Sequence, residues 1–104
     1  MSDLAVEVVD VPERSRYEAR VAGALAGAAE YQLSQRLVVF THTVVDPQYE
    51  GQGVGGRLVR AALDDVRAKG LHIVPLCPFV KTWIGSHPDY ADLVYGAPRS
   101  TATD

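Results

Sequence analysis

Four glycines lie within six residues in the segment 51–56 (Gly-Gln-Gly-Val-Gly-Gly), after an apolar stretch and directly before a helical pattern. Glycine lets the backbone approach a ligand closely. The unpaired N–H groups of a first helical turn then attract an anion, and the helix dipole adds to that attraction. A loop of this composition between a strand and a helix indicates a phosphate-binding site rather than a plain reversal of the chain.

Two common phosphate-loop families do not fit this loop. A Walker loop ends in Gly-Lys-Ser/Thr, whereas Gly56 is followed by Arg57. The spacing of Gly51, Gly53 and Gly56 does satisfy the dinucleotide-binding fingerprint, but that site also needs an acidic residue about 20 positions further on to hold the ribose. Residues 66–88 contain no Asp or Glu, so we do not expect a nicotinamide cofactor.

Cys77 and His42 are the candidate catalytic residues. Cys77 follows an apolar strand pattern and precedes Pro78, a residue suited to the first position of a helix. A helix N-terminus favours the nucleophilic thiolate, but a lone buried cysteine is usually a small apolar core residue, and the residue types alone favour that role. His42 alternates with apolar residues in a strand pattern, where it is either an inert strand histidine or a base that accepts a proton from an amine or from Cys77.

The remaining histidines and aromatic residues are expected to be structural. His72 begins a strand and is expected to be exposed, and His87 precedes Pro88 and is expected to shape a helix end. No pair among the histidines and the cysteine has the short separation of a structural zinc site, so we expect no metal. A Cys–His hydrolase is chemically possible but leaves the glycine loop unexplained. We expect aromatic side chains to pack in the core or between helices at Phe79, Trp83 and Tyr90.

The hydrophobic pattern predicts a sheet followed by helices. Period-two alternation and β-branched runs predict strands, and the sequence from residue 53 changes to helical spacing with a glycine just past the predicted end. The fold class is therefore α/β (α+β), with a mixed, mostly antiparallel sheet and helices packed on its faces. The predicted strands are 4–9, 17–21, 24–33, 36–45 and 71–76, the last buried on both faces; the predicted helices are 53–69 and 78–86, with a further turn at 89–94.

Composition fits one small globular domain. The chain has 104 residues, 47% of them hydrophobic, and one cysteine, which suits a reducing, cytoplasmic setting. A net charge of -3 argues against nucleic-acid binding, and no segment resembles a signal peptide or a membrane span. We expect a single domain over 1–95 and a disordered polar tail over 96–104.

The loop and its surroundings resemble the GNAT acetyltransferases. Residues 48–53 (Gln-Tyr-Glu-Gly-Gln-Gly) match the Gln/Arg-x-x-Gly-x-Gly/Ala pyrophosphate motif of that superfamily. With Thr-His-Thr at 41–43 and Pro-Leu-Cys-Pro at 75–78, the chain is similar to a subfamily of very small, cysteine-containing GNAT-like proteins over about residues 17–94. The resemblance implies a reduced GNAT-like fold that binds acetyl-CoA or CoA.

The resemblance also assigns roles to residues. It implies that backbone N–H groups from Gln52 to Arg57 hold the pyrophosphate, that Cys77 faces the acetyl thioester as a nucleophile or as a pocket wall, and that His42 is the base. Tyr90 would protonate the departing CoA thiolate, and Arg57, rather than Lys81, would pair with a CoA phosphate. The implied cofactor-binding residues are Val44, Val45, Gly51, Gln52, Gly53, Val54, Gly55, Gly56 and Arg57.

Two parts of a full-length GNAT enzyme are missing from the sequence. The two helices that usually follow the first strand are absent, and so is the final pair of strands; these parts normally build the acceptor half of the cleft. The expected activity is acetyl transfer to an unidentified amine, on a small molecule or a protein. The alternative is a non-catalytic CoA-binding or interaction module. We expect no nucleic-acid or membrane partner, and a monomer or weak homodimer.

Overall fold

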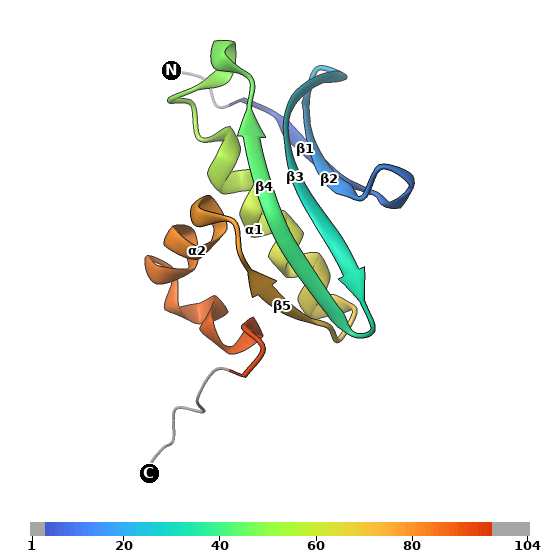
Figure 1. Cartoon of the computed structure of the whole chain (residues 1–104). Coiled ribbons are helices and arrows are strands. Elements are labelled where there is room, and N and C mark those ends of the chain that lie inside the picture. Colours follow the sequence, from blue (N-terminus) through green and yellow to red (C-terminus); the bar gives the residue numbers. More distant parts are fainter. Residues whose placement is uncertain (1–3, 97–104) are drawn as a thin grey trace.

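The computed structural model describes residues 4–96 and consists of one five-stranded sheet with two α-helices (Figure 1). The strand order is β1-β2-β3-β4-β5; the first four strands are antiparallel and β4 pairs with β5 in parallel. Except for Gly96, the tail predicted over 96–104 lies outside the described residues. The elements are β1 (Val6–Val11), β2 (Arg16–Val21), β3 (Ala24–Ser34), β4 (Leu37–Val45), α1 (Val54–Ala68), β5 (His72–Pro75) and α2 (Pro78–Gly85), then a 3₁₀ segment (Pro88–Leu93).

These elements confirm the predicted order of strands and helices, with ends shifted by only a few residues. Two-residue turns connect β2 to β3 and β3 to β4, and such short connections force antiparallel pairing. Both turns use positive φ angles, at Ala22 (52°) and Gly23 (83°) in the first and at Gln35 (56°) in the second. The parallel pairing of β4 with β5 needs a longer crossover, which α1 supplies.

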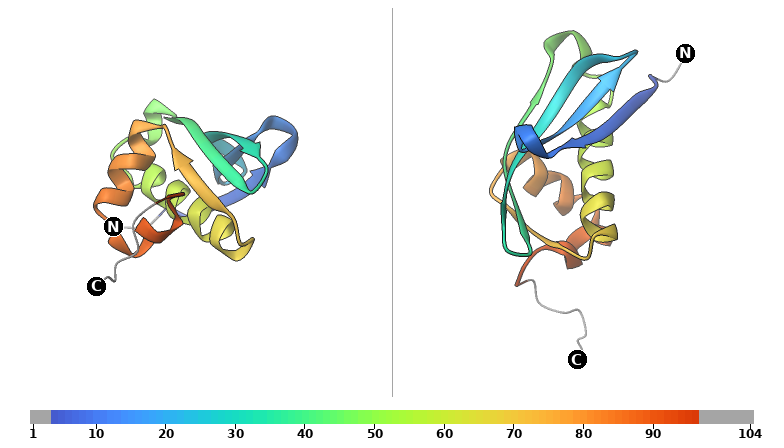
Figure 2. Two further views of the ribbon diagram at one scale, coloured as in Figure 1. Left: turned by 60° about the horizontal axis from the view of Figure 1, so that its bottom comes forward. Right: turned by 90° about the vertical axis from the view of Figure 1, so that its right-hand side faces the viewer.

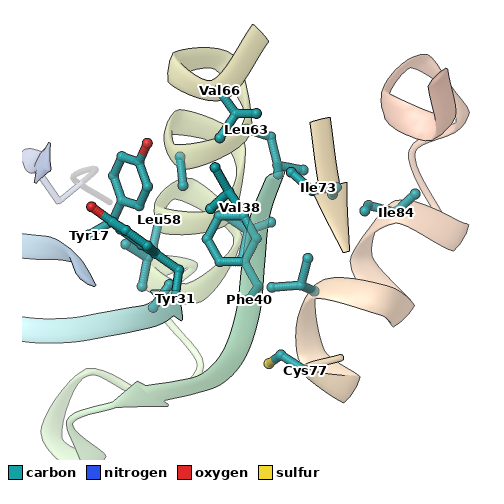
Figure 3. Close-up of a cluster of buried hydrophobic side chains, with 14 of the residues drawn as sticks. Tyr17, Tyr31, Val38, Phe40, Leu58, Leu63, Val66, Ile73, Cys77 and Ile84 are labelled. Atoms are coloured by element: carbon teal, nitrogen blue, oxygen red, sulfur yellow. The ribbon is translucent and has the colours of Figure 1, made fainter. Parts of the chain in front are cut away.

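Helix α1 is amphipathic and lies along the sheet. Its fully buried side chains include Leu58 and Leu63, spaced so that one stripe of the helix faces the strands. Opposite them in the core lie Phe40 of β4 and Ile73 of β5 (Figure 3). The predicted pair of Asp65 and Lys69 forms at 2.8 Å.

Both helices pack on the same face of the sheet. Figure 2 shows α1 running along one side of the sheet, and a single hydrophobic core joins it to the strands and to α2. The opposite face, which we call the open face, carries apolar side chains that remain half exposed, such as Leu25 (46%) and Val44 (49%). The mixed, mostly antiparallel sheet is confirmed, and the helices cover only one of its faces.

The prediction that β5 is buried on both faces is wrong. Only Ile73 of this strand is fully buried, and Leu76, directly after the strand, is 65% exposed. The apolar run at 71–76 suggested two-sided burial, but β5 is an edge strand and no described helix covers the open face. Short apolar runs therefore do not distinguish burial on one side from burial on both.

Glu18 is the buried charged residue of the described chain, at 5% exposure, and it projects from β2 toward the open face. Arg16 and Arg20, two positions away on either side along the strand, each approach one of its carboxylate oxygens at 2.7 Å. Hydrogen bonds from Arg20 and then Arg16 lower the pKa of Glu18 despite its burial. This triad keeps the carboxylate charged within the sheet.

We predict that Glu18→Gln destabilises the fold at pH 7 by roughly 1 kcal/mol, because charge-assisted hydrogen bonds are lost while the partial exposure of both arginines limits the effect. A lowered folded-state pKa stabilises the fold above the unfolded pKa, and this contribution disappears as the pH falls below the ordinary glutamate range near 4. Thermal unfolding from pH 3 to pH 8 measures the difference. Exposed Glu13→Gln is the matched control, and an equal loss at pH 3 and pH 7 would contradict the prediction.

Candidate active site

A pocket of about 400 Å³ lies where β4 ends and α1 begins. It is open toward solvent and is lined by the end of β4, the glycine loop, the first turn of α1 and one aromatic ring of α2. Five of the residues predicted from the loop line it: Gly51, Gly53, Val54, Gly55 and Gly56. Val45, also predicted, forms part of its wall together with Thr43.

The loop has a defined backbone path. Asp46 ends β4 and its side chain accepts a hydrogen bond from the N–H of Gln48 at 3.0 Å, which starts a short 3₁₀ turn (Pro47–Tyr49). Gly51 and Gly53 then adopt φ angles of 80° and 82°, where any side chain would strain the backbone. These two glycines are needed for the path of the chain itself, apart from any ligand.

The first turn of α1 directs backbone donors at the pocket. Among the described residues, the N–H groups of residues 53–56 have no hydrogen-bond acceptor, as expected at a helix N-terminus. The N–H of Gln52 is already bonded to Tyr49 O (3.3 Å), and that of Arg57 to Gly53 O (3.1 Å). An anion in this pocket would therefore be held by residues 53–56, a narrower set than the sequence predicted.

Charged side chains contribute little attraction to this pocket. The guanidinium of Arg57 donates a hydrogen bond to the backbone oxygen of Leu4, so it ties the N-terminal segment to α1, and Arg57 does not line the pocket. Glu50 does line it, and its carboxylate opposes an anion. Anion binding in this pocket would depend on backbone dipoles rather than on a cationic side chain.

Strands β4 and β5 separate next to the pocket. Their pairing ends at Phe40 and Pro75, and a last hydrogen bond runs from the N–H of Cys77 to Phe40 O at 2.9 Å. β4 continues to Val45, but no described strand pairs with this part of its β5-facing edge. An extended ligand with amide groups has free backbone partners there, and these include the predicted positions Val44 and Val45.

Cys77 caps the N-terminus of α2 and is buried, with 2% exposure. Its Sγ lies 3.2 Å from the Oγ1 of Thr43, and Figure 3 shows the sulfur directed toward β4. Thr43 lines the pocket whereas Cys77 does not. The thiol therefore lies behind the pocket wall, with one side chain between it and the open volume.

The structure does not bring His42 next to Cys77. The register shifts so that Glu30 pairs with His42 while Tyr31 pairs with Phe40, which leaves Thr41 as the extra residue of a β-bulge. His42 and Thr43 then project from opposite faces, and Thr43 is the one beside Cys77. His42 is exposed on the open face. The sequence analysis missed Thr43 as a site residue. The Thr-His-Thr pattern at 41–43 contained it, but strand alternation alone gave Thr43 no role.

The aromatic residues of α2 and the following turn separate into two groups. Phe79 lines the pocket and is 42% exposed, so it is not a core residue; its ring packs between the helices, against Gly55 of α1, which is the other role expected for it. Tyr90 is buried; its hydroxyl donates to Asp64 (2.8 Å), accepts from Arg60 (3.2 Å), and does not line the pocket. The hydrogen bond to Asp64 raises the pKa of Tyr90. These contacts give Tyr90 a structural role and do not support proton donation at the pocket.

The other predicted residues lie away from the pocket. His72 is exposed, and the Nδ1–H of His87 donates a hydrogen bond to Trp83 O (2.7 Å) at the end of α2, as expected for each. Within residues 4–96, no three histidine, cysteine or carboxylate side chains gather closely enough to form a metal site. No helix in that range is both long and apolar enough for a membrane span.

Comparisons with known proteins agree with this architecture. The profile of a family described as GCN5-related N-acetyl-transferase matches residues 16–93. The solution structure of a protein from Staphylococcus aureus, described as a GCN5-like N-acetyltransferase candidate, has 22% identity and a TM-score of 0.66, with all of both chains covered. A ribosomal-protein-alanine N-acetyltransferase from Brucella melitensis biovar Abortus has 20% identity and a TM-score of 0.52 over 86% of this chain and 67% of its own. These similarities show the fold, and no curated protein sequence matches.

The burial of Cys77 leads to a test of its reactivity. We predict that iodoacetamide labels Cys77 at least about tenfold more slowly in the folded protein than in denaturant, because access to a thiolate governs its reaction. Intact-mass spectrometry over time measures both rates. Thr43→Ala, which removes the covering side chain, should speed labelling of the folded protein; equal rates in folded and denatured wild type would contradict the burial.

Proposed function

The chain belongs to the family of GCN5-related N-acetyltransferases, and on that premise we propose that it transfers the acetyl group of acetyl-CoA to an amine. The observation that carries this proposal is the pocket at the separation of β4 and β5. One side of it presents the free N–H groups of residues 53–56, and the other presents an unpaired strand edge. This pairs an anion site with partners for an extended amide chain.

The residues fit the parts of acetyl-CoA in order. The pyrophosphate would be held by the N–H groups of residues 53–56 at the positive end of the α1 dipole. The pantetheine amides would pair with the backbone of β4 around Val44 and Val45. The acetyl group would then lie toward the point where β4 and β5 separate, near Thr43.

The transfer itself needs a base for the amine. Its nitrogen forms a bond to the thioester carbonyl carbon, the carbon–sulfur bond breaks, and CoA leaves as a thiolate. An ammonium acceptor must first lose one proton, and a second proton leaves the nitrogen during transfer. We assign proton removal to His42, which projects to the open face at the bulge beside the β4–β5 separation. The acceptor amine therefore approaches from the open face.

We propose that Cys77 supports the pocket wall from behind, through its contact with Thr43. A covalent route would need the thiol to reach the thioester. Cys77 is only 2% exposed, and its Sγ lies behind Thr43. Direct transfer from acetyl-CoA to the bound amine requires no such movement. The sulfur and hydroxyl pair instead positions the side chains that face the acetyl group.

A second candidate is a CoA-binding module without catalysis. The observation that favours it is the open face, where no described helix builds a wall around an acceptor. Such a module would bind CoA and acetyl-CoA equally and transfer nothing. Measured turnover with a panel of primary amines separates the two candidates.

We predict that calorimetry detects binding of acetyl-CoA and CoA but not of NAD. Gly55→Ala should weaken CoA binding by about tenfold or more, because the added Cβ would lie 2.6 Å from the Cζ of Phe79 and displace this ring from the pocket wall. Gly85→Ala in α2 is the matched control, since a Cβ there would have nothing within 4 Å and Gly85 does not line the pocket. Glu50→Gln should instead tighten binding, since it removes a charge that repels the anion.

The choice of Gly55 avoids a confounding effect. At Gly51 and Gly53 a side chain strains the backbone, so lost binding there would not distinguish a blocked site from a distorted loop. Melting temperatures of both variants should stay near that of the wild type, because the exposed Phe79 ring can move aside. Undiminished CoA affinity in folded Gly55→Ala would overturn the assigned pocket, and NAD binding as tight as CoA binding would overturn the choice of ligand.

We predict that His42→Gln lowers kcat for amine acetylation by about 100-fold, in the range for loss of a general base, with CoA affinity unchanged. Cys77→Ala should keep turnover within a few-fold of wild type, and acetyl-CoA without acceptor should leave no acetyl adduct on Cys77. Release of CoA thiol and intact mass measure these outcomes. An acetylated Cys77 that passes its acetyl group to the amine would establish the covalent route instead.

A further inference from the structure

A second groove, of about 530 Å³, lies along α2 and is not used by the function proposed above. It is lined by Pro78, Phe79, Thr82, Trp83, Ser86 and His87. Three of these residues carry aromatic rings at a spacing of four. Phe79 and Trp83 lie on α2, His87 follows its C-terminal end, and none of the three is fully buried. A half-exposed row of rings on a helix is suited to contact with a flat, aromatic ligand.

Trp83 and His87 form a fixed pair within this groove. Their rings are stacked with centroids 3.7 Å apart and planes within 9° of parallel. The Nδ1 of His87 also contacts Trp83 O at 2.7 Å, which holds the imidazole at the end of α2. The pair is therefore oriented before any ligand arrives, so that binding would cost little side-chain entropy.

The groove is continuous with the phosphate pocket. Phe79 lines both, and Trp83 Nε1 lies 3.6 Å from the position that a Cβ on Gly56 would take. The N–H of Gly56 is one of the free donors assigned to the pyrophosphate. The indole of Trp83 therefore borders the site from which the adenosine half of CoA would extend.

A cation lies on the same side of α1. Arg60 follows Gly56 by one helical turn, so both face α2. Its guanidinium carbon is 5.3 Å from the Trp83 ring centroid, and its Nη1 donates to the hydroxyl of Tyr90 at 3.2 Å. Arg60 is exposed, so it retains donors for a phosphate on a ligand that reaches Trp83.

We propose that the groove formed by Phe79, Trp83 and His87 binds the adenine of CoA, and that Arg60 pairs with the ribose 3′-phosphate. The inference rests on the proposed function and adds a nucleotide subsite to it. The adenine would contact the aromatic rings beside the pyrophosphate loop, and the guanidinium would distinguish CoA from its dephosphorylated form.

The chain contains a single tryptophan, so its fluorescence reports this groove directly. We expect titration with CoA and with adenosine 3′,5′-bisphosphate to change Trp83 emission, and 4′-phosphopantetheine to leave it unchanged. Calorimetry on the same samples measures binding independently of emission. CoA that binds in the calorimeter without any change in emission would overturn the inference and leave the proposed function intact, whereas no CoA binding at all would overturn both.

Two variants test the roles of the side chains. His87→Ala should weaken CoA binding by about tenfold, in the range measured for base–aromatic stacking, with no change for 4′-phosphopantetheine. His72→Ala, which removes an exposed histidine outside the groove, is the matched control. Arg60→Met should lower CoA affinity to that of dephospho-CoA without affecting dephospho-CoA itself, and exposed Lys81→Met is its control. Melting temperatures identify any variant that unfolds, and for such a variant the emission titration of the wild type decides.

If the Trp83–His87 pair only stabilises the C-terminal end of α2, His87→Ala will lower the melting temperature and weaken the binding of CoA and of 4′-phosphopantetheine by the same factor. If Arg60 only donates its hydrogen bond to Tyr90 and does not contact the 3′-phosphate, then Arg60→Met will reduce the affinities for CoA and dephospho-CoA by the same factor. Either result would overturn the corresponding part of the inference.

Discussion

The separation of β4 from β5 is the constraint on which the rest of this structure depends. The parallel ladder ends because the chain bends at Leu76, whose N–H bonds back to Val74 O at 3.1 Å, and then enters α2 at Pro78. The hydrogen bond from Cys77 to Phe40 O, at 2.9 Å, is the last link between the two strands. Beyond it, β4 retains backbone groups without a partner strand, and unpaired backbone groups favour a polar ligand or water.

The two helices hold this opening in shape. At the loop end, α1 meets α2 where Gly55 faces the ring of Phe79, a contact that leaves no room for a Cβ. At the other end, Asp65 of α1 accepts the hydroxyl hydrogen bond of Tyr17 at 2.7 Å, and burial raises the pKa of this tyrosine well above its ordinary value. Lys69 adds a link from Asp65 to Asp10 of β1. The helix is thus fixed to the sheet along its length, which keeps its N-terminal donors aimed at the pocket.

In the proposed function, the open face is the accessible side for the acceptor. A single core on one face of the sheet is enough for a chain of this size, because α1 and α2 cover the same side. The other face remains compatible with water since Glu18 is paired with two arginines and the remaining exposed side chains are small or polar over much of β3. An acceptor that reaches His42 meets no described helix, so a macromolecular amine fits this face as well as a small one does.

Local sequence determined much of this protein. Hydrophobic periodicity alone predicted α1 and β4 to within a residue or two, because those patterns depend on neighbours one turn or two residues away. The glycine loop could also be predicted from the sequence, because the positive φ angles at Gly51 and Gly53 and the helix start after them are local requirements. The family resemblance, carried by these same short motifs, agrees with the profile match over residues 16–93.

Only the tertiary structure decided which side chains meet. The bulge at Thr41 changes the register by one residue, and a one-residue change exchanges the two faces of a strand. That shift sends His42 to the open face and places Thr43 against Cys77. Phe79 is exposed at the pocket because of where α2 packs against α1, and the sequence of α2 alone does not predict that packing. Contacts between residues far apart in the chain depend on register and helix placement, which hydrophobic patterns leave undetermined.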